Sequence, residues 1–161
     1  MSVNRDRPHL FILPEDRANS ELATGFHLEI DPLRQRQMQI LPIAGGWQKV
    51  LNIFKADHVA YMRRFPNRFM ILVIDFDERE DRFETAQQFI PDDLKDRVFV
   101  LGSRKEPEDL RRAGIGSNED IGLALAKDCR EDNYRTWGHE LLNHNAGELE
   151  RLREKVRPIF F

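Results

Sequence analysis

The hydrophobic positions of this chain gather in short runs, and longer amphipathic stretches separate them. The runs are HLFIL, QMQILPI, FMILVI and VFVL, at residues 9–13, 37–43, 69–74 and 98–101. The third run is apolar without alternation, which is typical of a strand buried on both faces of a parallel sheet. The pattern therefore predicts four strands, of which the third is the most clearly defined.

Helical patterns lie between these runs. Residues 15–24 have a helix-forming composition before Gly25, residues 47–62 carry apolar side chains at helical spacing, and a further helix is predicted near residues 82–89. The order β-α-β-α-β-α-β implies a parallel sheet with right-handed crossovers. The predicted fold class is α/β, a Rossmann-like three-layer domain with a four-stranded or slightly larger, mainly parallel sheet.

The last third of the chain is predicted to be helical. The helical segments are expected near residues 107–113, 118–129 and 138–156. They would form an extension (103–161) on a core at residues 9–102, within one domain covering residues 1–161. The chain ends in PIFF (158–161), which is too apolar for a solvated tail. We expect this end either to fold back as an edge strand or to be covered by a partner.

Composition limits the location of the protein and the kinds of partner and metal site that it can have. The chain is 40% hydrophobic and 33% charged, as soluble globular proteins are, and it has no apolar run near the roughly 20 residues that cross a bilayer. The first apolar run stops at Leu13 without a secretory cleavage site, so a cytoplasmic protein is predicted. The lone Cys129 excludes an internal disulfide and argues against structural zinc. With a net charge of −3, contact with nucleic acid would depend on local patches or metal ions.

Acidic residues follow two of the predicted strands. Glu15 and Asp16 follow the first strand, and Asp75 and Asp77 follow the third. Ligands of open parallel sheets bind beyond the carboxyl ends of the strands, where these acids would meet if the two strands are neighbours. Crowded carboxylates repel one another, and Mg²⁺ or Mn²⁺ is the natural cation to relieve them. The sequence therefore predicts an acidic metal site at this edge.

Three short motifs in this order resemble the Toprim fold of topoisomerases, primases and OLD-type nucleases. They are FILPED after the first strand, PIAGGW after the second and LVIDFD after the third, and the match covers residues 9–102. The resemblance implies Mg²⁺-dependent nuclease chemistry on nucleic acid, with Glu15 near the scissile phosphate and Asp75 and Asp77 holding metal. It also suggests a partner ATPase and a role in bacterial defence or DNA repair.

The chain departs from the nuclease pattern at two positions. Asp16 stands where many nuclease-type members have glycine, and Asn19 stands where they have a second acid. These departures favour one metal over two. They also support the alternative of a non-catalytic Toprim-like subunit that binds a protein partner or forms a homodimer.

The segment after the fourth strand, GSRKEPEDL, could complete the site. Either Glu106 or Glu108 could supply a further metal ligand, although a helix start at Pro107 explains both acids equally well. Arg104 and Lys105 are the basic residues best placed to contact a nucleic-acid backbone.

Overall fold

A four-stranded, all-parallel sheet forms the centre of the protein. The computed structural model describes residues 7–77, 79–103, 114, 116–140 and 142–161. The strands are β1 (His9–Pro14), β2 (Met38–Ile40), β3 (Arg68–Val73) and β4 (Val98–Leu101), in the spatial order β2-β1-β3-β4. The predicted α/β class with a parallel sheet is confirmed. The second strand is shorter than its apolar run, because the chain leaves the sheet after Ile40.

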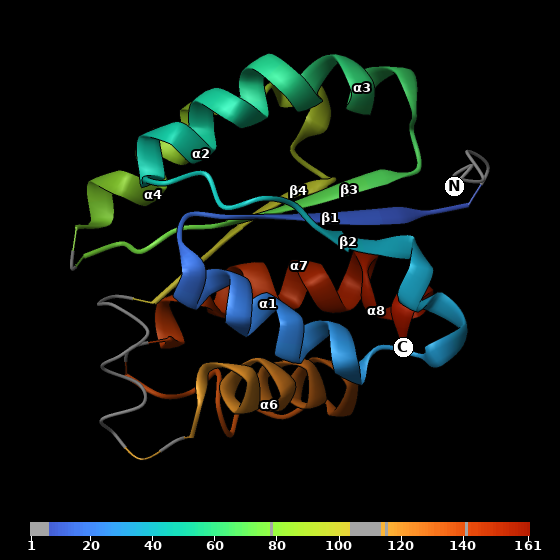
Figure 1. Cartoon of the computed structure of the whole chain (residues 1–161), viewed down its shortest axis with the longest axis vertical. Coiled ribbons are helices and arrows are strands. Elements are labelled where there is room, and N and C mark those ends of the chain that lie inside the picture. The colour runs from blue at the N-terminus through green and yellow to red at the C-terminus, as the bar shows by residue number, and fades with distance from the viewer. Residues whose placement is uncertain (1–6, 78, 104–113, 115, 141) are drawn as a thin grey trace.

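Helices cover both faces of the sheet (Figure 1). One face carries α2 (Trp47–Ile53), a π-helical turn (Phe54–His58), α3 (Val59–Arg64) and α4 (Glu80–Phe89). The other carries α1 (Arg17–Glu29), α6 (Asn118–Glu131), α7 (Ala146–Lys155) and α8 (Arg157–Phe160). Short 3-10 turns lie at Pro32–Gln37, Asp92–Leu94 and Asn143–Asn145. The helix predicted near residues 107–113 lies outside the described residues. Among the helices that are described, none is long and apolar enough to span a membrane.

Two apolar cores lie on the two faces of the sheet. Along β1 and β3, Ile12 and Ile71 pack with α1 and α6, whereas Leu13 and Leu72 pack with α2 and α3. All four side chains are buried. Because neighbouring side chains of a strand point to opposite faces, a strand covered on both faces needs apolar residues at every position. This explains the unbroken apolar runs.

The contact between α1 and α6 depends on two glycines. A Cβ built on Gly25 would lie 2.0 Å from the carbonyl oxygen of Glu119, and one built on Gly122 would lie 1.9 Å from that of Leu22. The expectation that the first helix stops before Gly25 is wrong, since α1 continues to Glu29. Gly25 is present because the α6 backbone passes against it.

Side chains near α7 cover the open edge of β4. The Glu148 carboxylate accepts a hydrogen bond from the Val100 N–H at 2.8 Å. The Asn145 amide bonds both the N–H and the carbonyl of Gly102, at 3.2 and 2.9 Å. Arg151 donates to the carbonyl of Val98 at 3.2 Å. The helical extension therefore bonds several of the backbone groups that lie on the side of β4 away from β3.

The apolar C-terminal end is buried by the protein itself. Residues 158–160 lie in α8 and Phe161 follows it, and Phe160 is fully buried in the core between α1, α6 and α7. The Phe161 ring packs edge-on against Phe26, and the Asp31 N–H donates to the Phe160 carbonyl at 3.0 Å. Self-burial was one of the two expectations, but the end is helical and not an edge strand.

The glycine contact yields a stability prediction. Gly122→Ala should lower the free energy of unfolding by about 1 to 3 kcal/mol, because the added methyl overpacks the α1 backbone. Gly147→Ala is the matched control, since its Cβ would meet nothing within 4 Å. We expect it to raise stability by about 0.5 to 1 kcal/mol through helix propensity alone. Urea denaturation followed by circular dichroism measures both; equal effects of the two substitutions would contradict the proposed role of Gly122.

Candidate active site

Glu15 and Asp75 meet at the carboxyl ends of β1 and β3. The two strands pair in parallel, and beyond them the Glu15 N–H donates to the Val73 carbonyl at 2.9 Å. The Glu15 carboxylate then accepts a hydrogen bond from the Asp75 N–H, with 2.6 Å between Oε2 and N. The sequence-based expectation that these two acids share one edge is confirmed.

The backbone around Asp75 is held on several sides. Its carbonyl accepts a hydrogen bond from Arg82 Nη1 at 2.6 Å, and the next N–H, that of Phe76, donates to the Ser103 carbonyl at 3.0 Å. A Cβ on Gly102 would lie 1.6 Å from the carbonyl oxygen of the residue before Asp75. Only glycine therefore allows β4 to pass this closely, and Asp75 is left 6% exposed.

The Asp75 carboxyl is buried without adequate compensation. Among the described residues, its Oδ1 has no hydrogen-bond partner. Burial raises the pKa of Asp75 to about 8, with further contributions from the charges of Asp16 and Glu15, while the nearby Asn19 amide opposes the rise. Burial also raises the pKa of Glu15, against the lowering effect of the Asp75 N–H. Three acids, Glu15, Asp16 and Asp75, therefore lie close together at an edge of the sheet that is partly shielded from water.

Asp16 is the third acid of this group. Its carboxylate caps α1 by accepting a hydrogen bond from the Asn19 N–H at 3.0 Å. The sequence placed Asp16 beside Glu15 after the first strand and marked it as a departure from the nuclease motif, without giving it a role of its own. The structure places its charge close enough to raise the pKa of Asp75. A capping signal at the end of a strand was visible in the sequence, but its second role depends on the approach of β3.

Asp77 lies further out at the same edge. Its backbone adopts a φ of 50°, an uncommon value for a residue with a side chain, and its side chain is 69% exposed. The carboxylate lies 3.7 Å from Arg82 Nη2. Among the described residues, no hydrogen bond or ion pair joins Asp77 to Glu15 or Asp75. Within the residues that the structure describes, no group of three or more His, Cys, Asp or Glu side chains is arranged to hold a metal ion.

Arg82 is a site residue that sequence reasoning missed. Its side chain is 14% exposed, and its guanidinium carbon lies 5.1 Å from the centre of the Trp47 ring. Within the described structure its buried Nε has no hydrogen-bond partner. Trp47 is half-buried against this cation, although the sequence indicated only a core residue. The available signal was an arginine in the first turn of the helix that follows the D-F-D motif.

The remaining predicted site residues cannot be placed. Arg104, Lys105 and Glu108, with Glu106, lie outside the described residues.

Comparisons with protein families, curated proteins and solved structures find no match to this chain. The resemblance to Toprim proteins therefore stays a prediction from the three motifs, and the geometry of the site must support any function by itself.

The raised pKa of Asp75 predicts a pH dependence of stability. The folded protein keeps the Asp75 proton until about pH 8, whereas the unfolded chain loses it near the ordinary value of 3.8. The free energy of unfolding should therefore fall as the pH rises from about 4 to about 8. Asp75→Asn removes this contribution. Between about pH 5 and about pH 8, the fall in the free energy of unfolding should therefore be at least about 1 kcal/mol smaller in Asp75→Asn than in wild type.

Urea denaturation in EDTA at the two pH values tests this difference. Asp93→Asn is the control, because Asp93 is exposed and paired with Arg63. It should retain the wild-type dependence. The same fall in wild type and in Asp75→Asn would show that Asp75 is not protonated in the folded state.

Proposed function

We propose that the acidic edge binds Mg²⁺ or Mn²⁺ and cleaves phosphodiester bonds of nucleic acid. The observation that carries this proposal is the Asp75 carboxyl, which is buried beside Glu15 and Asp16 with one oxygen lacking a hydrogen bond in the described structure. A buried acid in this setting must keep a proton or gain a cation. Carboxylate oxygens are the ligands that these hard divalent ions prefer.

Glu15 and Asp75 would hold the cation, with Asp16 adding charge beside them and Asp77 as a further ligand from the solvent side. A divalent ion at such a site polarises a phosphoryl oxygen and lowers the pKa of bound water. The engaged carboxylate of Glu15 is compatible with this role, because its Oε2 accepts a backbone hydrogen bond and a carboxylate offers about four lone-pair sites in all. The proposed cytoplasmic location would supply both Mg²⁺ and nucleic acid.

Arg82 would neutralise the phosphate. Its guanidinium is held by Trp47 and by the Asp75 carbonyl, so it is already oriented at the edge where the phosphate would lie. A planar guanidinium matches the oxygens of a phosphate group, and one of its buried donors is unpartnered in the described structure. Arg104 and Lys105 remain proposed contacts to the rest of the nucleic-acid backbone. A partner ATPase remains part of the same proposal.

Metal binding can be measured without knowing the substrate. Mn²⁺ should bind the wild-type chain, and Asp75→Asn and Glu15→Gln should weaken binding at least about tenfold, while Asp93→Asn should not. Because binding displaces the Asp75 proton, the affinity should rise between about pH 6 and about pH 8. Isothermal titration calorimetry in two buffers of different ionisation enthalpy measures both the affinity and the released proton. No binding in the wild type would favour a non-catalytic, partner-binding subunit.

Cleavage tests the chemistry. With Mg²⁺ and single- or double-stranded DNA and RNA, Asp75→Asn and Asp77→Ala should each lower the cleavage rate at least about 100-fold, since loss of metal-held charge costs several kcal/mol. Thermal unfolding should show that Asp77→Ala leaves the fold intact, because Asp77 is exposed. Equal cleavage by wild type and both variants would identify a contaminant or another site.

A further inference from the structure

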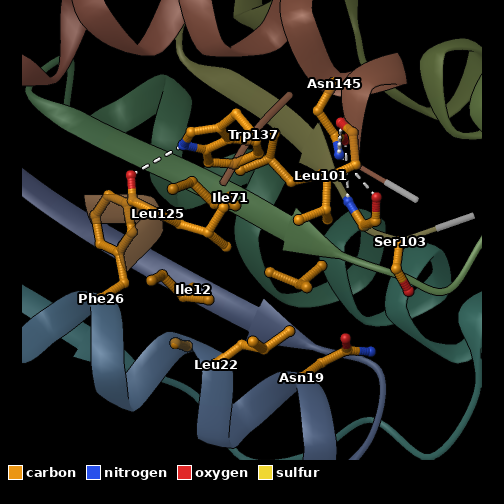
Figure 2. A pocket seen from close by; sticks show the side chains of 14 residues that line it. Ile12, Asn19, Leu22, Phe26, Ile71, Leu101, Ser103, Leu125, Trp137 and Asn145 are labelled. Carbon is orange, nitrogen blue, oxygen red and sulfur yellow. Dashed lines mark hydrogen bonds between the residues drawn. The ribbon is translucent and has the colours of Figure 1, made fainter. Parts of the chain in front are cut away.

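The two faces of the sheet differ in what they offer to a ligand. Under α1 and α6 lies a cavity of about 60 Å³, among apolar side chains such as Ile12, Ile71 and Leu101 (Figure 2). This volume is well below the roughly 150 Å³ that holds a benzene ring, so an aromatic ligand does not fit there. The opposite face is different at its surface. It carries α3 at the end of the sheet where β1 and β3 begin (Figure 1), with aromatic rings and arginines around it.

Three aromatic rings surround the guanidinium of Arg68, the first residue of β3. Its guanidinium carbon lies 5.0 Å from the centre of the Phe11 ring. The centres of the Tyr61 and Phe65 rings lie 5.4 and 4.8 Å from the same carbon. The Tyr61 and Phe65 rings are themselves stacked, with centres 6.2 Å apart, and Arg64 lies 5.5 Å from the centre of the Phe65 ring. We call these five residues the aromatic platform.

Tyr61 and Arg64 are the exposed members of the aromatic platform. Tyr61 is 53% exposed, because the π-helical turn before α3 directs it away from the core. Among the described residues no acid pairs with Arg64, whereas its neighbour Arg63 forms an ion pair with Asp93 at 3.0 Å. An exposed ring beside an exposed guanidinium without an acid suits a ligand that carries both flat rings and negative charges.

Arg97 holds the turn between α3 and β3, on which most of the aromatic platform lies. Its Nη1 donates to the carbonyls of Met62, Phe65 and Arg68 at 2.9, 3.2 and 3.1 Å. These bonds satisfy carbonyls at the end of α3, so Arg64 is not required for that purpose. The turn is therefore fixed before a ligand arrives, which lowers the ordering cost of binding.

We propose that the aromatic platform binds single-stranded nucleic acid, with a base stacked on Tyr61 and a backbone phosphate on Arg64. A base can stack on a side chain only when its ring face is open, as it is in a single strand and not within a duplex. A guanidinium matches the oxygens of a phosphate. The inference rests on the proposed function for the identity of the substrate, but this binding needs no metal.

The position of the aromatic platform relates it to the acidic edge. The chain is helical without a break from Trp47, through the π-helical turn, to Arg64. Trp47 lies at the acidic edge, with its ring centre 5.1 Å from the guanidinium carbon of Arg82. A rise of about 1.5 Å per residue puts Tyr61 about 21 Å from Trp47. About six stacked nucleotides, or fewer in an extended strand, span this distance. One strand can therefore contact both sites.

Fluorescence anisotropy with labelled dodecathymidylate measures strand binding to the complete chain, in EDTA so that no metal contributes. Tyr61→Ala should weaken binding about five- to 100-fold through loss of stacking, and Tyr61→Phe should keep it within about threefold. Arg64→Gln should weaken binding and lower the slope against log salt concentration by about 0.7. Tyr134→Ala and Lys127→Gln are the matched controls at exposed positions on the α6 side, and they should change neither quantity.

Ring signals in NMR spectra of the wild-type chain locate the binding site without any destabilising substitution. The chain has two tyrosines, so Tyr134→Phe assigns both sets of ring signals. A stacked base should shift the Tyr61 ring protons upfield and leave those of Tyr134 unmoved. Dodecauridylate should bind within about threefold of dodecathymidylate, because base faces and phosphates are common to RNA and DNA, and a duplex of the same length should bind at least about tenfold more weakly.

The outcomes separate this inference from the proposed function. Equal binding by wild type and Tyr61→Ala, an unmoved Tyr61 signal, or duplex binding as tight as that of the single strand would overturn the role of the aromatic platform, even if Mn²⁺ binds and cleavage occurs. Strand binding that depends on Tyr61, with no binding of Mn²⁺, would support the aromatic platform and reject the metal-dependent function.

Discussion

One hydrogen bond, from the Asp75 N–H to the Glu15 carboxylate, joins the ends of the two central strands. It continues the β1–β3 pairing past its last backbone contact, with a side chain standing in for a carbonyl. The bond brings the buried Asp75 together with the half-buried Glu15, and Asp16 adds a third acid. The edge is therefore arranged at a cost in stability, which a proton on Asp75 offsets in part. Residues whose placement lowers the stability of the folded protein are often functional residues.

Much of the fold could be predicted, because strand patterns and topology rules act over short distances. Short apolar runs indicated all four strands, and their alternation with helices indicated the parallel sheet. Predictions failed where distant contacts decide the outcome. Gly25 reads locally as a helix end, but α6 packs against it. Tyr61 continues an apolar stripe and yet is 53% exposed, because a π-helical turn precedes α3 and shifts the face that it presents.

The same distinction between local signals and distant contacts applies to the site. Glu15 and Asp75 could be placed from sequence, since each follows a strand and neighbouring parallel strands end at one edge. Arg82 and Asn19 could not, because their importance lies in what surrounds them: an aromatic ring and a carbonyl for the arginine, and the Asp75 carboxyl for the asparagine. A single sequence does not record which buried polar groups are left without partners. That information requires the packing of several elements together.

The covering of β4 by the side chains of Glu148, Asn145 and Arg151 bears on how the chain is made. An uncovered edge strand can pair with another molecule and begin aggregation. These three residues follow β1, β3 and β4 in the sequence, so a ribosome releases them after the three strands have already emerged. Until α7 docks, a growing or truncated chain carries an apolar strand with an open edge. The side chains near α7 thus protect the edge of the sheet, and this protection begins only after residues as far as Arg151 have been made and have folded.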